Sequence, residues 1–294
     1  MLLSTQTDRF GQRFGDENAV RMLAAAGFDA IDYSMFGMIH EDHILRGDEA
    51  EKYVDHLRAV AEECGVVFNQ AHAPFSFKGW DDPEIFNKEI FPTVARSVEL
   101  AARMGVKIIV VHPLHHRQYL GNEEAMYELN MNYYRSLIPY CEKNGIKVAT
   151  ENMWQRDKKR NYIIHDVCSR AKEFNRYLDD IGSEWIVGCL DVGHCGLVGI
   201  EAQDMIREMG GKHIHALHVH DNDYLSDAHV EPFSGKMDWK EIAKALGEVN
   251  YQGDFTFESD NYFNPMDKEF MPQGAKYLHD IGRYLMGIVE ANRK

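Results

Sequence analysis

The sequence predicts a single (β/α)₈ TIM barrel, an α/β fold in which eight parallel strands alternate with helices. Units in which a helix ends at a glycine and leads directly into an apolar strand recur at a period close to 40 residues, at Gly27, Gly65, Gly105 and Gly145. The strand segments are near-continuous apolar runs, which suits strands covered on both faces in a parallel sheet. Eight such runs in 294 residues match one barrel of about 250 residues plus insertions.

The expected strands, taken in order, are short runs rich in Val, Ile, Ala and Phe. They cover residues 2–4, 28–34, 66–71, 108–111, 147–150, 186–190, 214–219 and 254–257. The expected helices lie between and after them, at residues 17–26, 49–64, 92–104, 122–143, 164–180, 199–210, 238–248 and 268–290. Since no Pro/Gly/Ser-rich or charged linker interrupts this alternation, the sequence predicts one domain spanning residues 1–294.

The charge and the composition argue against nucleic-acid and membrane partners. A formal net charge of −15 at pH 7 disfavours extended binding to nucleic acid, because phosphate backbones are repelled. No apolar stretch approaches the 18 or so residues of a membrane span, and the N-terminus does not read as a secretory signal. We therefore expect a cytoplasmic enzyme with a small-molecule substrate and neither a nucleic-acid nor a membrane partner, and a homo-oligomer is compatible with the sequence.

Residues able to bind a metal or transfer a proton stand at the ends of six expected strands. They are His72, His112, Glu151, Asp191, His218 and Glu258. Their spacing is close to 40 residues except for the shorter step from Asp191 to His218. Side chains that close successive barrel strands reach one rim, where barrel enzymes keep their active sites. Like charges on one rim repel each other unless a cation holds them, so the pattern predicts a metal site.

Each motif taken alone has a structural alternative. Glu151 could cap the next helix or pair with an arginine, and the pair Asp191 and His194 could form an Asx turn with an incidental histidine. His72 and His112 precede prolines and could shape loops. Aromatic residues near strand ends are expected to wall a pocket or to pack under loops, namely Tyr33, Phe75, Trp80, Trp154 and Trp239.

The order of the motifs resembles the xylose isomerase-like superfamily, and more closely its sugar phosphate isomerase/epimerase branch, which shares a domain with AP endonuclease family 2. The motifs run H, HP, EN, DxGH, HxxD, DxH, G, W and E, from His72 to Glu258. The resemblance implies one divalent cation held by Glu151, Asp191, His218 and Glu258, with His194 contacting substrate. Further substrate contacts are expected at His72, His112, Trp154, Asp157 and His229. Tyr224 stands where the 3-epimerases of this group have an arginine.

The favoured function is that of a metal-dependent sugar epimerase or isomerase. An oxygen-rich ligand set suits Mn²⁺ most, with Mg²⁺, Co²⁺ and Zn²⁺ as alternatives. Glu151 and Glu258 would remove and return a proton beside the chelated carbonyl of a ketose or keto-polyol, while His194 would donate a hydrogen bond to the substrate oxygen. The same site could serve a dehydratase or a lyase that cleaves keto-glycosides.

A nuclease is the second alternative. The three-zinc AP endonucleases have nine metal ligands, and residues of the same types occur in this sequence in the same order. Asp227 and His229 complete that set. The N-terminal portion, LLSTQTDRFGQRFG, lacks the His-x-Ser and glycine-rich signature of those enzymes.

Overall fold

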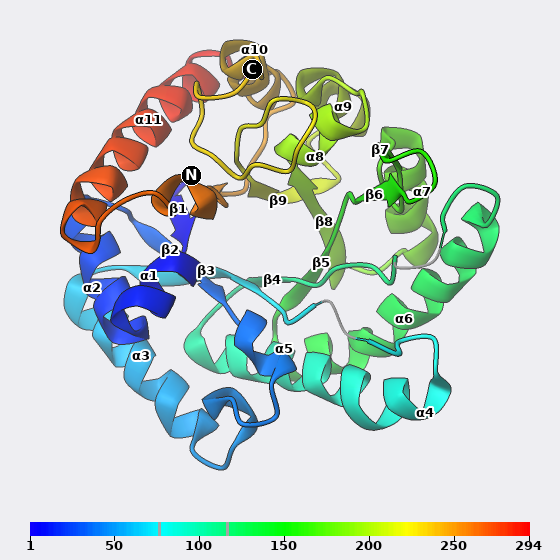
Figure 1. The fold of residues 1–294 in the computed structure, drawn as a ribbon, viewed down its shortest axis with the longest axis horizontal. Helices are drawn as coiled ribbons and strands as arrows, with labels where there is room; N and C mark the ends of the chain where they lie inside the picture. The colour runs from blue at the N-terminus through cyan, green and yellow to red at the C-terminus, as the bar shows by residue number, and fades with distance from the viewer. Residues whose placement is uncertain (76–77, 116–117) are drawn as a thin grey trace.

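A ring of eight parallel strands forms the centre of the molecule (Figure 1). The structure is a computed structural model and describes residues 1–75, 78–115 and 118–294. The strands are β1 (Leu3–Gln6), β2 (Ala30–Ser34), β3 (Val67–His72), β4 (Ile108–Val110), β5 (Lys147–Glu151), β8 (Ile186–Asp191), β9 (Ile214–His218) and β10 (Phe255–Phe257). They are ordered β10-β1-β2-β3-β4-β5-β8-β9, and a parallel bridge from Val219 to Phe257 joins the two ends. The predicted (β/α)₈ barrel is confirmed.

Helices surround this ring on the outside (Figure 1). They are α1 (Asp8–Phe14), α2 (Asp16–Ala26), α3 (Ala50–Cys64), α4 (Pro83–Ile85), α5 (Phe91–Met104), α6 (Glu123–Asn144), α7 (Ala171–Ile181), α8 (Val192–Leu197), α9 (Ala202–Met209), α10 (Trp239–Glu248) and α11 (Met271–Ala291). Short turns of 3₁₀ or π helix lie at Phe36–Ile39, Ile44–Arg46, Phe86–Ile90, Asp260–Phe263 and Lys268–Phe270. The C′ glycine that ends α5, Gly105, has a left-handed φ of 92°, which a residue with a Cβ adopts only with strain.

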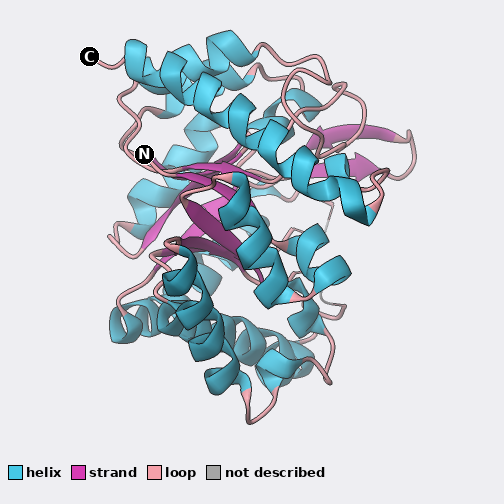
Figure 2. Cartoon of the chain, turned by 90° about the vertical axis from the view of Figure 1, so that its left-hand side faces the viewer, coloured by secondary structure: helices cyan, strands magenta, loops and turns pink. Residues whose placement is uncertain are grey.

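The predicted helix at 164–180 is wrong at its N-terminal end. Tyr162–His165 is strand β7, which pairs antiparallel with β6 (Trp154–Asp157). The turn of this hairpin is held by the side chain of Asp157, which accepts hydrogen bonds from the backbone N–H groups of Lys159 and Arg160 at 2.8 and 3.0 Å. Figure 2 shows this hairpin projecting from the end of the barrel opposite the chain termini.

The side chains inside the barrel are apolar along its middle and polar at one rim. Val110, Ala149, Val187, Cys189 and Ala216 form a small buried cluster on the inner face. Since side chains alternate along a strand, the inward residues that follow these on β5, β8 and β9 are the strand-end candidates of the sequence. Among the described residues, no helix combines the length and apolar character needed to cross a membrane.

Candidate active site

Four of the six strand-end residues converge on one point at the rim. Glu151, Asp191 and His218 are the last residues of β5, β8 and β9, and Glu258 follows β10. One potential ligand atom from each lies within 4.8 Å of those of the other three, and all four side chains are buried. His218 Nδ1 lies 3.1 Å from Glu151 Oε1 and 3.3 Å from Glu258 Oε2. The structure therefore assembles the predicted ligand set.

These residues fit a divalent cation. Ligand atoms about 2.0–2.2 Å from one ion lie at most about 4.4 Å apart, so the observed spacing needs only a small inward movement of the side chains. Burial by itself raises the pKa of Glu151. The imidazoles of His218 and His112 lower it by a larger amount, so the pKa lies well below its usual range. A buried, ionised carboxylate of this kind needs a positive partner, which a bound cation supplies.

Polar residues on the first three strands support the ligands from below. Gln6 Nε2 donates a hydrogen bond of 2.9 Å to Glu258 Oε1. Asp32 Oδ2 faces His218 Nε2 at 3.8 Å and accepts a hydrogen bond of 3.1 Å from Gln70. Burial raises the pKa of Asp32 to about 7, although His218 lowers it in part. Sequence reasoning missed these three residues, whose signal is a polar side chain at an inward position of an apolar strand.

His72 and His112 border the ligand set on the side of Glu151. The His72 Nδ1 group lies 2.9 Å from the carbonyl oxygen of Ala73, so it donates and leaves the Nε2 lone pair facing the site. That Nε2 lies 3.1 Å from His112 Nε2, which in turn lies 3.1 Å from Glu151 Oε2. Burial and the neighbouring His112 keep the pKa of His72 well below its ordinary value. His72 is therefore a neutral acceptor at the site.

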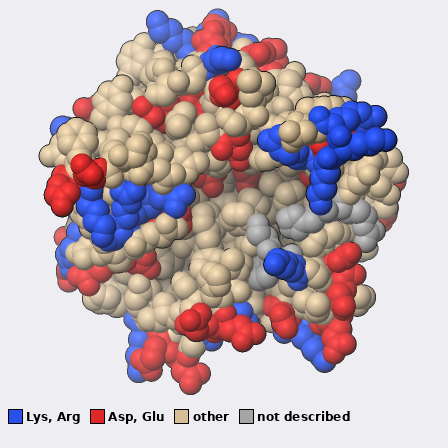
Figure 3. Space-filling view, in the orientation of Figure 1, with Lys and Arg blue, Asp and Glu red and all other residues tan. Residues whose placement is uncertain are grey.

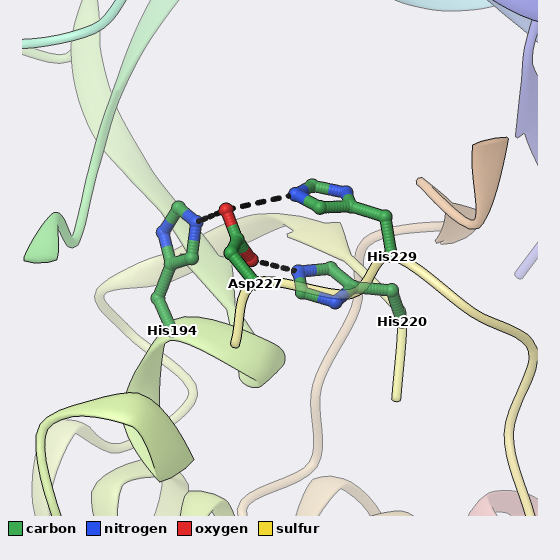
Figure 4. A group of neighbouring side chains, drawn as sticks. All are labelled: His194, His220, Asp227 and His229. Carbon is green, nitrogen blue, oxygen red and sulfur yellow. Dashed lines mark ion pairs between the residues drawn. The ribbon is translucent and has the colours of Figure 1, made fainter. Parts of the chain in front are cut away.

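A second cluster joins Asp227 to three imidazoles (Figure 4). Asp227 Oδ2 lies 3.1 Å from His229 Nε2 and 3.6 Å from His194 Nε2, and Oδ1 lies 3.8 Å from His220 Nε2. The rings of His220 and His229 stack with centroids 3.9 Å apart. His220 was not among the predicted site residues, although the motif His-Val-His places it on the same side of the chain as His218.

The motifs around Asn152 and Gly193 hold His194 in place. The His194 Nδ1 group donates to the carbonyl oxygen of Asn152 at 2.7 Å, while the Asn152 side chain bonds the backbone of Asp191 in both directions at 2.8 Å. A Cβ on Gly193 would lie 2.1 Å from His220 Cε1, so only glycine fits there. Burial lowers the pKa of His194, but Asp191 and Asp227 raise it more, to about 10. His194 is therefore a hydrogen-bond donor through both nitrogens.

Asp221 organises the loop that carries Asp227 and His229. Its carboxylate accepts five hydrogen bonds, from the backbone N–H groups of residues 222, 233, 235 and 237 and from the indole of Trp239 at 2.7 Å. A Cβ on Gly235 would lie 2.3 Å from Asp221 Oδ1. The predicted motif residues Asp221, Gly235 and Trp239 therefore act by shaping the loop.

Replacing Asp221 by Asn should destabilise the protein. The NH₂ group of the asparagine would face N–H groups that now donate to the Asp221 carboxylate, and these donors would lose their acceptor. This should lower the free energy of unfolding by about 2–3 kcal/mol. Asp223→Asn is the matched control, because Asp223 lies on the same loop and bonds only its exposed turn, and it should change stability by less than about 0.5 kcal/mol. Urea unfolding of both variants measures the difference. Equal stability of the two would contradict the role given to Asp221.

A cavity of about 870 Å³ opens above the two clusters. Its lining includes the predicted substrate-binding residues, which are His72, His112, Trp154, Asp157 and His229, and also Phe75, Glu151, His194 and Glu258. The Trp154 indole donates to Asp227 Oδ2 at 3.2 Å. Asp157 reaches the cavity wall, but its carboxylate is engaged by Arg160 and the hairpin turn.

Three of the predicted aromatic wall residues lie elsewhere. Tyr33 is buried in the core and donates its hydroxyl to Asp16, and Trp239 packs behind Asp221. Trp80 lines smaller cavities on the side of α4 and α6. Tyr224, which replaces the arginine of the resembling enzymes, directs its hydroxyl to Glu201 and to the Lys236 carbonyl. Sequence position did not separate these buried aromatic residues from Phe75 and Trp154.

The profile of the family described as "Xylose isomerase-like TIM barrel" matches residues 20–281. The chain belongs to this family. The chain is similar to a D-psicose 3-epimerase of Enterocloster bolteae, which is 31% identical over 244 residues, covering 79% of this chain and 72% of the relative. An uncharacterised protein of Sinorhizobium fredii is 26% identical over 269 residues, covering 83% and 82%.

Two solved structures share the fold of this xylose isomerase-like barrel along nearly their whole length. A D-tagatose 3-epimerase-like protein has a TM-score of 0.77 at 20% identity, with 99% of each chain covered. A 3-keto-D-glucoside 4-epimerase of E. coli has a TM-score of 0.71 at 17% identity, covering 97% of this chain and 99% of that one. At these identities the two structures support the barrel fold. At the level of the family, the chain is a sugar-epimerase-like TIM barrel with groups of residues suited to a metal.

Proposed function

We propose that the protein is a divalent-metal-dependent sugar epimerase or isomerase that transfers a proton at the carbon next to a carbonyl. The observation that carries the proposal is the position of Glu151 and Glu258. They approach the shared His218 Nδ1 from β5 and from the end of β10, at 3.1 and 3.3 Å. Two carboxylates placed on different strands around one ligand set can address opposite sides of a reacting carbon, which inversion requires.

The chain supplies the proton transfer and the pocket. A divalent cation held by Glu151, Asp191, His218 and Glu258 would polarise the substrate carbonyl and stabilise the charge that develops on its oxygen. One glutamate removes the proton next to the carbonyl, and the other returns a proton on the opposite face. His194, whose Nδ1 donates to the Asn152 carbonyl, would donate a hydrogen bond from Nε2 to the substrate oxygen.

Mn²⁺ is the cation that we propose for this site. The ligand set offers three carboxylates and one imidazole, with no thiolate among them. Such hard oxygen ligands favour Mn²⁺, Mg²⁺ or Co²⁺ over a soft, thiolate-bound metal, and Zn²⁺ remains compatible with the imidazole.

A three-zinc AP endonuclease is the second candidate. Further groups with metal-ligand spacing overlap or adjoin the central ligand set, among them His72–His112–Glu151 and His194–His220–Asp227–His229. The net charge of −15 favours the sugar enzyme, because it opposes the approach of DNA.

A dehydratase or a keto-glycoside lyase would share the first proton transfer with the epimerase, so the substrate decides between them.

A substrate panel tests the proposal. The Mn²⁺-loaded protein is incubated with free ketoses, inososes and keto-glycosides, and the products are separated by chromatography. We expect epimerisation or isomerisation of at least one ketose or keto-sugar, dependent on the added cation and abolished by a chelator. Cleavage of abasic-site DNA with no turnover of any sugar would favour the nuclease and contradict the proposal.

A further inference from the structure

A group of basic side chains stands at the mouth of the active-site cavity. Arg156, Lys158, Lys159 and Arg160, here named the basic lip, lie at the tip of the hairpin β6–β7 and are exposed. All four line the same cavity as the proposed catalytic residues. Figure 3 shows Lys and Arg side chains gathered beside the central hollow, at the place that the hairpin occupies in Figure 1.

Most of the charge of the basic lip is not neutralised by the protein. Arg160 pairs with Asp157 at 2.8 Å, and Arg156 lies 3.4 Å from the side-chain oxygen of Asn161. Within residues 1–75, 78–115 and 118–294, no ion pair joins Arg156, Lys158 or Lys159 to a carboxylate. Arginines on the outer helices differ in this respect. Arg103, for example, pairs with two acidic side chains and Arg207 with three.

The basic lip also contrasts with the charge of its surroundings. Residues 156–160 carry four positive charges and one negative charge, a net of +3, in a chain of net charge −15. The lining of the cavity at the barrel rim includes the carboxylates of Glu151, Asp227 and Glu258. A local positive patch at the mouth of such a cavity concentrates anions and orients them with the charged end outward. A neutral sugar would gain little from it.

We propose, building on the proposed function, that the substrate carries an anionic group, a phosphate ester or a carboxylate, at the end distant from the reacting carbonyl, and that the basic lip binds this group. The cavity of about 870 Å³ is continuous from Glu151 and His194 to Lys158 and Lys159. It thus has room for a sugar whose carbonyl lies at the ligand set while its charged end reaches the hairpin. Basic residues recognise both anions, and phosphate carries the greater charge.

Calorimetric titration of the Mn²⁺-loaded protein tests this assignment with three probes that differ only at carbon 6. They are D-fructose, D-fructose 6-phosphate and D-fructuronate, the carboxylate analogue. We expect at least one anion to bind roughly tenfold or more tightly than D-fructose at low salt, with the advantage falling as NaCl is added. The tighter of the two anions identifies the charged group as phosphate or carboxylate.

Charge reversal at the lip supplies the matched comparison. Lys158→Glu with Lys159→Glu should remove the advantage of the anion, a loss of roughly tenfold or more, while the affinity for D-fructose stays within about twofold. Lys212→Glu with Lys276→Glu makes the same change in net charge at exposed lysines outside the cavity lining, and it should leave the advantage intact.

Three results would overturn the assignment. The first is anions that bind no more tightly than D-fructose, and the second is a control double variant that loses as much as the lip variant. The third is binding of abasic-site DNA that depends on Lys158 and Lys159, with no preference among the three probes. Because the comparison of affinities does not depend on conversion of the probes, an inactive substrate panel with intact anion binding would count against the proposed reaction alone.

Discussion

Replacing Glu258 by Gln should lower turnover by roughly 10²–10⁴-fold while changing the substrate KM far less. The amide keeps the size of the side chain and can still accept the hydrogen bond from Gln6 Nε2, but it cannot accept a proton at neutral pH. Because Glu258 also belongs to the proposed ligand set, weaker metal binding should move the loss towards the upper end. Steady-state kinetics at saturating Mn²⁺ separates turnover from binding.

Glu151→Gln should behave in the same way, because both carboxylates take part in the proton transfer that we propose. Glu231→Gln is the control. Glu231 lies on the loop before Trp239 and bonds Ser234, so its variant should keep turnover within about twofold. A Glu258→Gln enzyme with nearly unchanged turnover would remove Glu258 from the proton transfer.

Asp191→Asn and His218→Ala should lose the metal and the activity while the barrel still folds. The ligands stand on the rim, above the apolar inner cluster of the barrel, and removing one ligand should weaken cation binding by roughly 100-fold or more. We expect about one equivalent of divalent cation per wild-type chain by elemental analysis, and nearly none in either variant. Circular dichroism should show unchanged secondary structure.

His215→Ala is the matched control for His218→Ala. His215 lies on the same strand, β9, with its side chain on the opposite face and half-buried. Its variant should keep the metal. Close to three equivalents of zinc in the wild-type protein would instead favour the nuclease, and unfolding of the His218→Ala variant would make His218 a structural residue.

The barrel, and the convergence of four strand-end side chains on its rim, could be predicted because both follow from local sequence patterns. Each C′ glycine marks the end of a helix and the start of an apolar run, and six of the eight runs end in or are followed by a residue with metal-binding chemistry. In a parallel barrel the strand ends meet at one rim, so Glu151 and His218, which are 67 positions apart, must come together. Sequence order alone was enough for this step.

Other parts depend on contacts between distant segments. Residues 164 and 165 of β7 fall inside the helix predicted at 164–180, because the pairing of β7 with β6 is not visible in the local sequence. The contact between Asp32 and His218 could not be predicted, because it depends on how β2 and β9, which are far apart in the chain, are placed in the barrel. The basic lip was missed for the same reason, since only the hairpin brings its charges to the cavity.

Deuterium incorporation from solvent tests the central claim, that a proton is transferred next to the carbonyl. The metal-loaded wild-type enzyme is allowed to convert its sugar fully in D₂O, and the product is analysed by NMR and mass spectrometry. The account predicts one deuterium at the carbon next to the carbonyl, because the glutamate that returns the proton exchanges with solvent. Full conversion to a product without solvent deuterium would contradict it and indicate a hydride shift within the substrate.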